Sequence, residues 1–376
     1  MRLAWLEVRD FRNHRETSVE FPSEVVVVLG ANAQGKTNLL EAIHYLLTLG
    51  SPRASSDEPL VRRGADRAYL RGEVETAGGK VLVEVEVRAS GANRIQVNRS
   101  GVRRKRDLRQ RVRSVMFIPE DLAVVQGQPE DRRRFLDEAS LSLWPPLETA
   151  RRSYDRSLRQ RNRLLKEHEG SGAPDDLEAW DAELVHHGTS VTAGRAAAVA
   201  RAGPRAGDEY QTVAGERLAV RYRSSVAPDG VESVAGSVTE PGQPEASAAL
   251  SRWFLDRLAA RRGDELVRRT TLVGPHRDDL ELSVGDLAAR GFASHGEAWA
   301  AALCLRLAVA GALGADVGDP PVVVLDDPFS GLDPVRRRRV GEGLSGRGQV
   351  VIAVPDEAQV PADAKVWEVE DGRVRT

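Results

Sequence analysis

The chain has 376 residues, longer than one typical domain, so we expect either two lobes or one domain with a large insertion. Hydrophobic residues make up 41% and charged residues 29%, and we find no apolar run of the roughly 18 residues that a spanning helix needs. Residues 1–20 lack an apolar signal-peptide core and Cys304 is the single cysteine, so we expect a cytoplasmic protein with no membrane partner and no disulfide framework.

The charge is unevenly distributed along the chain. The net charge is −2, but residues 1–170 contain 31 Lys+Arg against 24 Asp+Glu, a net of +7. The remaining residues contain 23 against 32, a net of −9. The first half is therefore the half suited to an anionic partner.

The first third of the chain is rich in predicted strands. Residues 1–9 alternate as a strand, and E-V-V-V-V-L-G at 24–30 is the β-branched run of a buried parallel strand. N-L-L-E-A-I-H-Y-L-L-T-L follows with a helical period, and residues 69–97 read as meander strands with turns at 77–79 and 90–93. The sequence thus predicts strand, glycine loop and helix in succession, beside a β-rich flank.

The middle of the chain has a different character. Residues 130–215 are rich in Arg, Glu and Ala at helical spacing, broken by a turn at 170–174, and predict a helical insertion. A polar stretch rich in Gly, Pro and Ser at 224–247 predicts a loop or linker.

An α/β pattern then resumes. It predicts an apolar helix at 297–313, a strand at 321–327, a helix at 334–344, and a strand at 349–354 that closes the sheet.

The first chemical motif is G-A-N-A-Q-G-K-T at 30–37. A glycine-rich loop between strand and helix lets backbone N–H groups surround phosphates. Lys36 reaches the outer phosphates and the Thr37 hydroxyl is placed for Mg²⁺. The sequence therefore predicts an ATP site, with Mg²⁺ as cofactor, formed by Gly30, Ala31, Asn32, Ala33, Gln34, Gly35, Lys36, Thr37 and Asn38.

The second motif is V-V-V-L-D-D-P-F-S-G-L-D at 322–333, at the end of an apolar strand. We expect Asp326 to be the carboxylate on the metal side. Asp327, pointing the other way, is expected to orient or deprotonate the attacking water, with Lys36 as the second catalytic residue. Asp333 ends the loop beyond and is assigned to the nucleotide site.

Nearly 290 residues separate the two motifs, and this separation indicates that a large insertion divides the ATPase. ABC-type heads are organised in this way, with the nucleotide of one subunit covered by a Ser-Gly signature from another. Ser294 and Gly296 precede the helix at 297, where N–H groups and the helix dipole favour a phosphate. We expect a dimer sandwich; the simpler alternative is that Ser294 is an ordinary N-cap.

Several strings along nearly the whole chain resemble the RecF family of recombination mediators, which are related to the structural-maintenance-of-chromosomes and Rad50 heads. They are F-R-N-H at 11–14, G-K-T-N-L-L-E-A-I at 35–43, F-I-P-E-D-L at 117–122, R-R-R-F-L-D at 132–137, Q-R-N-R-L-L-K at 160–166, W-D-A-E-L at 180–184, T-L-V-G-P-H-R-D-D-L at 271–280, F-A-S-H-G at 292–296 and L-D-D at 325–327. The fold class is therefore α/β, an ABC-type P-loop ATPase head with a β-rich flank and an inserted helical lobe. Its expected segments are an N-terminal ATPase lobe (1–129), the helical lobe (130–265) and a C-terminal ATPase lobe (266–376).

The resemblance implies an ATP-dependent homodimer that binds duplex or gapped DNA without sequence preference, in recombinational repair and replication-fork maintenance. It implies that RecR- and RecO-like proteins are partners in loading recombinase at gaps. It also places Arg12 and Asn13 near the nucleotide, with Ser294 and Gly296 reaching across the dimer. Weak, DNA-stimulated ATP hydrolysis is the expected activity.

The sequence departs from the family pattern in four places. Ala33 replaces a usual Gly, which is tolerable only if its φ stays below zero. Glu297, Ala298 and Trp299 follow Gly296 where Gln and a basic residue are usual, and a carboxylate facing a γ-phosphate would repel it. D-D-P-F-S-G-L-D looks like a transporter loop, and Pro355 stands where hydroxyl residues are expected. Slow hydrolysis, or none, follows from these departures.

The basic cluster at 99–113 has the density and sign of a phosphate-backbone footprint, although a solvated hairpin and helix would read the same way. The resemblance favours DNA contact by Arg103, Arg104, Lys105, Arg106 and Arg109. His276 either approaches the nucleotide interface or shapes a turn. Two other functions stay open: the nucleotide-binding subunit of a membrane importer, and a scaffold that binds ATP or DNA without turnover.

Overall fold

The computed structural model describes residues 1–21, 25–168, 172–227, 248–361 and 364–376. These residues form two compact units. Unit 1 consists of residues 1–122, 208–217 and 293–376, and unit 2 of residues 123–207 and 218–292. The expected segments 1–129, 130–265 and 266–376 do not coincide with these units, because the inserted unit also contains residues on both sides of the expected helical lobe.

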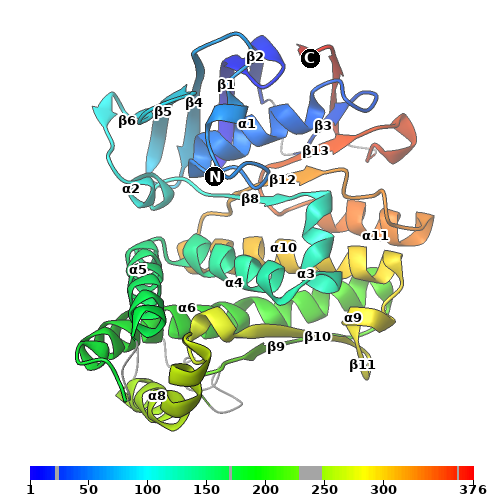
Figure 1. Ribbon diagram of the computed structural model, residues 1–376. Helices are drawn as coiled ribbons and strands as arrows, with labels where there is room; N and C mark the ends of the chain where they lie inside the picture. Colours follow the sequence, from blue (N-terminus) through cyan, green and yellow to red (C-terminus); the bar gives the residue numbers. More distant parts are fainter. Residues whose placement is uncertain (22–24, 169–171, 228–247, 362–363) are drawn as a thin grey trace. The chain divides into compact units, whose positions relative to one another are not determined.

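Unit 1 contains an antiparallel sheet that corresponds to the expected strand at the start of the chain and the expected meander (Figure 1). Its spatial order is β2 (His14–Glu20), β1 (Arg2–Phe11), β4 (Arg67–Thr76), β5 (Gly79–Arg88), β6 (Arg94–Val97) and β7 (Ser100–Gly101). Alternate residues of β4 and β5 are buried, which is the period-2 pattern of a sheet with one face in the core. Gln349 also joins this sheet to the rest of the unit, because its side chain bonds both backbone groups of Leu3.

The second sheet of unit 1 has a parallel centre. Its order is β15 (Arg373–Arg375), β14 (Lys365–Glu370), β3 (Val25–Leu29), β13 (Val350–Val354), β12 (Val322–Asp326) and β8 (Ser114–Phe117). The prediction that the strand at 349–354 closes the sheet is wrong: β13 lies between β3 and β12. The glycine loop and Asp326 therefore follow strands on either side of β13, at the same carboxyl edge of the sheet.

Helix α1 (Lys36–Thr48) lies between the two sheets of unit 1 (Figure 1). Leu39, Leu40 and Ile43 are fully buried, in one core cluster with residues of β1, β4, β5 and β13. The other helices of unit 1 are α2 (Lys105–Arg109), α10 (His295–Val317) and α11 (Pro334–Leu344), with short turns η1 (Glu58–Leu60), η2 (Pro119–Leu122) and η4 (Glu357–Gln359). The predicted bounds of α11 and of the strand end at 354 are confirmed.

By length and mean hydropathy alone, α10 could cross a membrane, although it contains no uninterrupted apolar run of that length. Single polar residues such as Arg306 interrupt the apolar run, but the mean hydropathy of the helix remains high. However, 78% of its most apolar window is buried inside the protein, and Arg306 is paired with Asp121. Helix α10 is thus the core helix of unit 1.

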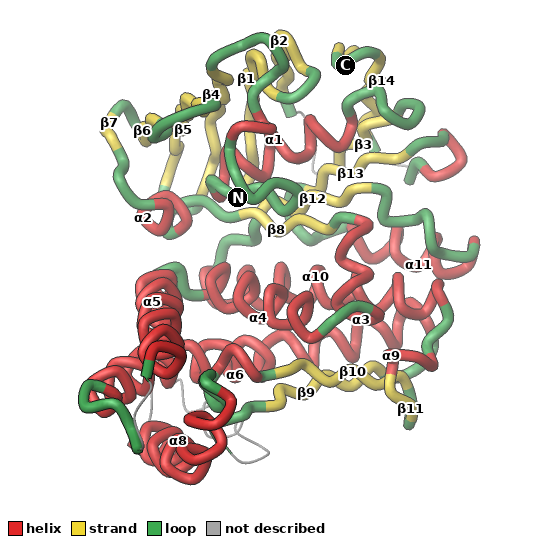
Figure 2. The backbone as a smooth tube through the Cα atoms, in the orientation of Figure 1, coloured by secondary structure: helices red, strands yellow, loops and turns green. Residues whose placement is uncertain are grey.

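Unit 2 combines helices with a small sheet (Figure 2). Its helices are α3 (Ala123–Gln126), α4 (Pro129–Leu143), α5 (Leu147–Glu167), α6 (Leu177–Ala214, whose last turns belong to unit 1), α8 (Ala248–Arg268) and α9 (Ala289–Phe292), with the turn η3 (Pro275–Arg277). The sheet order is β11 (Leu287–Ala288), β10 (Asp279–Val284) and β9 (Leu218–Arg223). Residues 170–171 of the expected turn at 170–174, and residues 228–247 of the expected linker at 224–247, lie outside the described residues.

Buried ion pairs hold the helices of unit 2 together. Arg161 of α5 is fully buried, bonds Asp181 of α6 at 2.7 Å and bonds Glu265 of α8 at 2.6 Å. Its third bond goes to the hydroxyl of Thr271. A buried arginine is stable only with such complete pairing. The strings at 160–166, 180–184 and 271–280 therefore meet here as structural elements.

His276 lies within the turn η3 and binds it to neighbouring segments of unit 2. Its Nε2 lies 3.1 Å from the Thr271 carbonyl, and its Nδ1 lies 2.6 Å from the Tyr154 hydroxyl. The carbonyl can only accept, so Nε2 carries the proton and Nδ1 accepts from Tyr154. Burial lowers the pKa of His276 to about 4. Both contacts lie within unit 2, which fits the turn-shaping interpretation.

Candidate functional site

The glycine loop connects β3 to α1 in unit 1. Gly35 has φ 114°, a conformation that a side chain would strain, and a Cβ there would lie 2.7 Å from Asn13 Nδ2. Ala33 has φ 67°, so the condition that its φ stays below zero is not met. A non-glycine residue costs roughly 1–2 kcal/mol in this region, and the loop carries this strain.

Lys36 lies folded against the loop. Its Nζ donates to the carbonyl oxygens of Gly30 at 2.5 Å and Ala31 at 2.8 Å. Burial lowers its pKa, while the nearby Asp326 and Asp327 carboxylates oppose that shift. The ammonium is thus held at the loop by weak acceptors that a phosphate group would outcompete.

Thr37 and Asp326 meet despite their separation in the sequence. The Thr37 hydroxyl lies 2.8 Å from Asp326 Oδ2 and 3.0 Å from Oδ1. Asp326 ends β12 and is only 6% exposed, and this burial raises its pKa to about 6. A hydroxyl beside a carboxylate is the oxygen-donor set that Mg²⁺ favours.

Asp327 leaves the strand instead of continuing it. Its φ is 46°, and its N–H donates to the Ala353 carbonyl of β13 at 3.0 Å. Its Oδ1 is buried and has no hydrogen-bond partner within the described part of the chain. Burial raises its pKa, opposed by Ser330, Lys36 and Arg337. This orphaned oxygen next to the glycine loop is suited to holding a reacting water.

Asn13 supports the glycine loop from the β1–β2 turn. It donates to the Gln34 carbonyl at 3.3 Å and accepts from Asn38 at 2.8 Å. His14 lies behind it, fully buried, with Nε2 3.0 Å from the Gly35 carbonyl. His14 was not predicted to belong to the site, although it is the last residue of F-R-N-H.

The turn between β14 and β15 also supports the loop, and no motif in the sequence predicted this contact. The Gly372 N–H donates to the Gln34 carbonyl at 2.8 Å, and the Asp371 N–H donates to the Gln34 side chain at 2.8 Å. A Cβ at Gly372 would lie 2.6 Å from the Asn13 carbonyl, so this close approach requires glycine.

Arg12 binds α1 directly. Its guanidinium makes two bonds of 2.8 Å to Glu41, which is fully buried, and a third to the Pro59 carbonyl at 2.9 Å. The bidentate pair fixes the β1–β2 turn against the helix that follows the loop. Contact between Arg12 and a nucleotide stays a prediction.

Ser294 is the N-cap of α10, as the simpler interpretation held. Its hydroxyl accepts from the Glu297 N–H at 3.3 Å, and the Glu297 carboxylate accepts from the Ser294 N–H at 2.7 Å. Hydrogen bonds from the backbone and the side chain of Ser294 to the carboxylate lower the pKa of Glu297. The carboxylate expected to repel a phosphate is therefore occupied by a capping box. A contact of Ser294 and Gly296 across a dimer stays a prediction.

Trp299 links α10 to the loop that follows β12. Its indole N–H donates to the Pro328 carbonyl at 2.8 Å, and a Cβ on Gly331 would lie 2.6 Å from the indole. Asp333 ends that loop as the N-cap of α11, accepting from Val335 at 2.9 Å and Arg336 at 3.0 Å. Trp299, one of the departures from the family pattern, thus packs against this loop of its own chain.

The five basic residues assigned to DNA differ in their surroundings. Arg103 and Arg104 are exposed at the start of α2. Lys105 donates to the Leu49 carbonyl and Arg109 to the Thr48 carbonyl at 2.7 Å, which satisfies the C-terminal end of α1. Arg106 lies near Asp107 at 3.6 Å. DNA contact stays a prediction for all five, and Lys105 and Arg109 also have a structural role.

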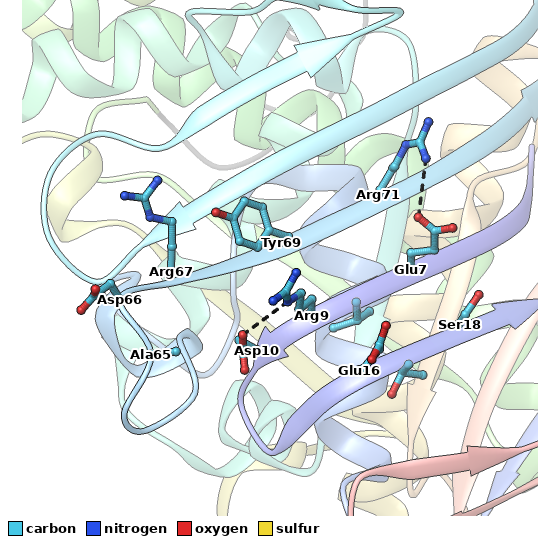
Figure 3. A pocket seen from close by; sticks show the side chains of 12 residues that line it. Glu7, Arg9, Asp10, Glu16, Ser18, Ala65, Asp66, Arg67, Tyr69 and Arg71 are labelled. Atoms are coloured by element: carbon cyan, nitrogen blue, oxygen red, sulfur yellow. Dashed lines mark ion pairs between the residues drawn. The ribbon is translucent and has the colours of Figure 1, made fainter.

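A shallow pocket of about 610 Å³ lies on the outer face of the antiparallel sheet (Figure 3). Arg9, Arg67 and Arg71 line it with Tyr69, but so do four carboxylates: Glu7, Asp10, Glu16 and Asp66. Arg71 lies 3.6 Å from Glu7, and Arg9 lies 3.8 Å from Asp10 (Figure 3). Such a balanced, paired surface does not attract a polyanion.

Comparison with known proteins gives a consistent result. Residues 2–371 match the family described as the RecF/RecN/SMC N terminal domain. The chain is 42% identical to the DNA replication and repair protein RecF of Kineococcus radiotolerans, covering 96% of this chain and 95% of that protein. It is 40% identical to the protein of the same name from Cutibacterium acnes, with 95% and 93% covered.

Solved structures agree with this match. The chain superposes with a TM-score of 0.85 and 28% identity on "Structure of the recombination mediator protein RecF-ATPrS in RecFOR pathway", covering 99% of this chain and 97% of the other. The corresponding RecF-ATP structure gives a TM-score of 0.84 at 28% identity, with 99% and 96% covered. An SMC head bound to the C-winged helix domain of ScpA gives 0.56 at 14% identity, with 100% and 96% covered, a likeness of fold alone.

Proposed function

Because the chain belongs to the RecF family, we propose that it is an ATP-dependent DNA-binding protein of recombinational repair and replication-fork maintenance. The observation that carries this proposal is the meeting of Thr37 and Asp326 at 2.8 Å beside the glycine loop. A chance motif would not bring two residues from opposite ends of the chain to the same edge of one sheet.

The residues present fit ATP and Mg²⁺. The loop between β3 and α1 offers backbone N–H groups at the start of a 13-residue helix, where its dipole favours phosphate. The Thr37 hydroxyl and the Asp326 carboxylate would hold Mg²⁺, which neutralises charge on the phosphates when bound. Similarity to structures described as RecF-ATP and RecF-ATPrS supports the same cofactor.

The side chains around the loop would divide the chemistry between them. Lys36 exchanges the Gly30 and Ala31 carbonyls for phosphate oxygens. Asp327 would accept a hydrogen bond from the attacking water through its unpartnered oxygen and orient it. Asp326 keeps the Thr37 hydroxyl in place. Any hydrolysis is slow, because Pro355 ends β13 without a hydroxyl to sense the γ-phosphate.

We infer that ATP closes two copies of the chain into a dimer, with Ser294 and Gly296 of one copy facing the nucleotide of the other. The closed dimer binds duplex or gapped DNA through its phosphates, and Arg103 and Arg104 are the exposed cations best placed to contribute. The RecFOR pathway named for the similar structures supports RecR- and RecO-like partners and a cytoplasmic location. The importer alternative loses its support, because its transporter-like loop occurs in a chain that matches RecF along its length.

The experiment is a gel shift of gapped duplex DNA with and without ATP and Mg²⁺, together with the molar mass by light scattering under the same conditions. The wild type should dimerise and retain DNA only with ATP. Lys36→Ala is the matched control and should do neither. If the wild type shows no ATP-dependent retention of DNA, the proposed function is wrong.

A further inference from the structure

The segment that follows Gly296 contains no cation, although it opens the helix proposed to face a γ-phosphate. Glu297, Ala298 and Trp299 stand there. The folded chain brings a cation to this place from α11: a Cβ built on Gly296 would lie 3.3 Å from Arg336 Nη1. Arg336 thus lies beside residues 294–296, the signature loop, although the two segments are distant in sequence.

The position of Arg336 is fixed from its own helix. Its backbone N–H donates to Asp333 Oδ1 at 3.0 Å, and its Nε lies 3.5 Å from Asp333 Oδ2. The side chain is 22% exposed, so it is held without being removed from solvent. Because Nε faces Asp333, the far end of the guanidinium fork remains beside Gly296.

Arg336 also bears on the carboxylate that would oppose a phosphate. Glu297 is held back by the Ser294 N–H, and the positive charge of Arg336 further favours the ionised form of Glu297, lowering its pKa. The Glu297 carboxylate is therefore already opposed by a cation before any ligand arrives.

The three neighbouring arginines of α11 are committed elsewhere. Arg337 donates to the Leu332 carbonyl at 3.4 Å, Arg338 lies 3.8 Å from Glu342, and Arg339 donates to the Val213 carbonyl at 3.1 Å. Arg336 alone of this run has a contact with the signature loop among those that the structure describes.

We propose that Arg336 supplies the positive charge of the signature site and acts on the γ-phosphate held by the glycine loop of a second copy. It takes the place of a cation that the chain lacks at positions 297–299. This role rests on the proposed ATP-closed dimer and adds to it a residue outside the signature segment.

The test compares Arg336→Gln with Arg338→Gln, an exposed arginine on the same helix. ATP-dependent dimerisation is followed by light scattering across protein concentrations in Mg²⁺ and ATP. Arg336→Gln should weaken the dimer by roughly tenfold to a hundredfold, the effect of losing one charge-assisted hydrogen bond, and Arg338→Gln should match the wild type. ATP binding by the monomer should be unchanged in both variants.

Adding Glu297→Gln distinguishes charge from structure, because glutamine preserves the capping box. Arg336→Gln combined with Glu297→Gln should regain part of the lost dimer affinity, whereas a purely structural role at Asp333 would give no rescue. Dimerisation of Arg336→Gln equal to that of Arg338→Gln, or a double variant no better than Arg336→Gln, overturns the role of Arg336 alone. A wild type that binds ATP but stays monomeric overturns the closed dimer as well.

Discussion

Asp326 illustrates how a functional residue can oppose folding. Burial raises its pKa to about 6, so the folded state holds a proton that the unfolded state has released between about pH 4 and pH 6. Stability is therefore lost as the pH rises through this window, and the full penalty, roughly 3 kcal/mol from the pKa difference, applies above it.

We therefore expect Asp326→Asn to raise the melting temperature of the ligand-free protein at pH 7.5 and to abolish Mg²⁺-dependent ATP binding. Asparagine can still accept from Thr37 but has no charge to bury. Thermal unfolding at pH 4 is the internal control, because there the gain over wild type should largely vanish. A less stable variant at pH 7.5 would contradict this account.

His276 gives the opposite dependence. Its folded pKa, about 4, lies below the ordinary 6.5, so the unfolded state binds the extra proton in that window. Its contribution, roughly 3 kcal/mol, is complete above about pH 6.5 and is lost as the pH falls towards 4. His276→Gln should flatten the dependence of melting temperature on pH across this range. An unchanged profile would show that His276 does not titrate on unfolding.

The residues expected to bind the nucleotide or the metal could be predicted from the sequence better than the residues that support them. Lys36 and Thr37 were found because the glycine-loop motif has a fixed spacing, and Asp326 because it ends an apolar strand. The left-handed Ala33 was not, because backbone conformation depends on contacts such as those of Asn13 and Gly372 around the loop. His14 carries no spacing rule of its own.

At the scale of elements, α2 combines two roles that experiments can separate. Arg109→Ala removes a bond to the end of α1 and should lower the free energy of unfolding by roughly 1–2 kcal/mol. Arg103→Ala with Arg104→Ala should leave stability unchanged, weaken DNA binding, and reduce the slope of log affinity against log salt by roughly one per lost phosphate contact. Urea unfolding and fluorescence anisotropy on duplex DNA measure the two effects.

Wild-type DNA affinity in the Arg103 and Arg104 double variant would exclude these residues from the DNA interface. Loss of DNA binding in Arg109→Ala without loss of stability would instead assign Arg109 directly to DNA.

Elements with strong local signals were predicted well, whereas their arrangement was not. Helix 334–344 begins at a proline after an aspartate cap, and β13 is a short, mostly β-branched apolar run followed by Pro355. The position of β13 between β3 and β12 depends on pairing between distant segments. The sheet of β9, β10 and β11 was missed in part for the same reason, since β9 pairs with β10 across a long stretch of sequence and β11 has only two residues.

At the scale of the whole molecule, the proposed cycle depends on whether hydrolysis reopens the dimer. Asp327 is the residue that decides this. Asparagine tolerates its φ of 46° and matches its shape, so Asp327→Asn should preserve the loop while removing the carboxylate that orients water. ATP should still bind through Lys36 and Thr37.

Asp327→Asn should therefore accumulate as an ATP-closed dimer on DNA, with slower dissociation than the wild type and at least tenfold slower phosphate release, the loss expected for a general base. Stopped-flow phosphate detection and light scattering after dilution measure both, and Lys36→Ala, which should not dimerise, is the control. If Asp327→Asn and the wild type release phosphate and dissociate at equal rates, the chain binds ATP without using Asp327 in turnover.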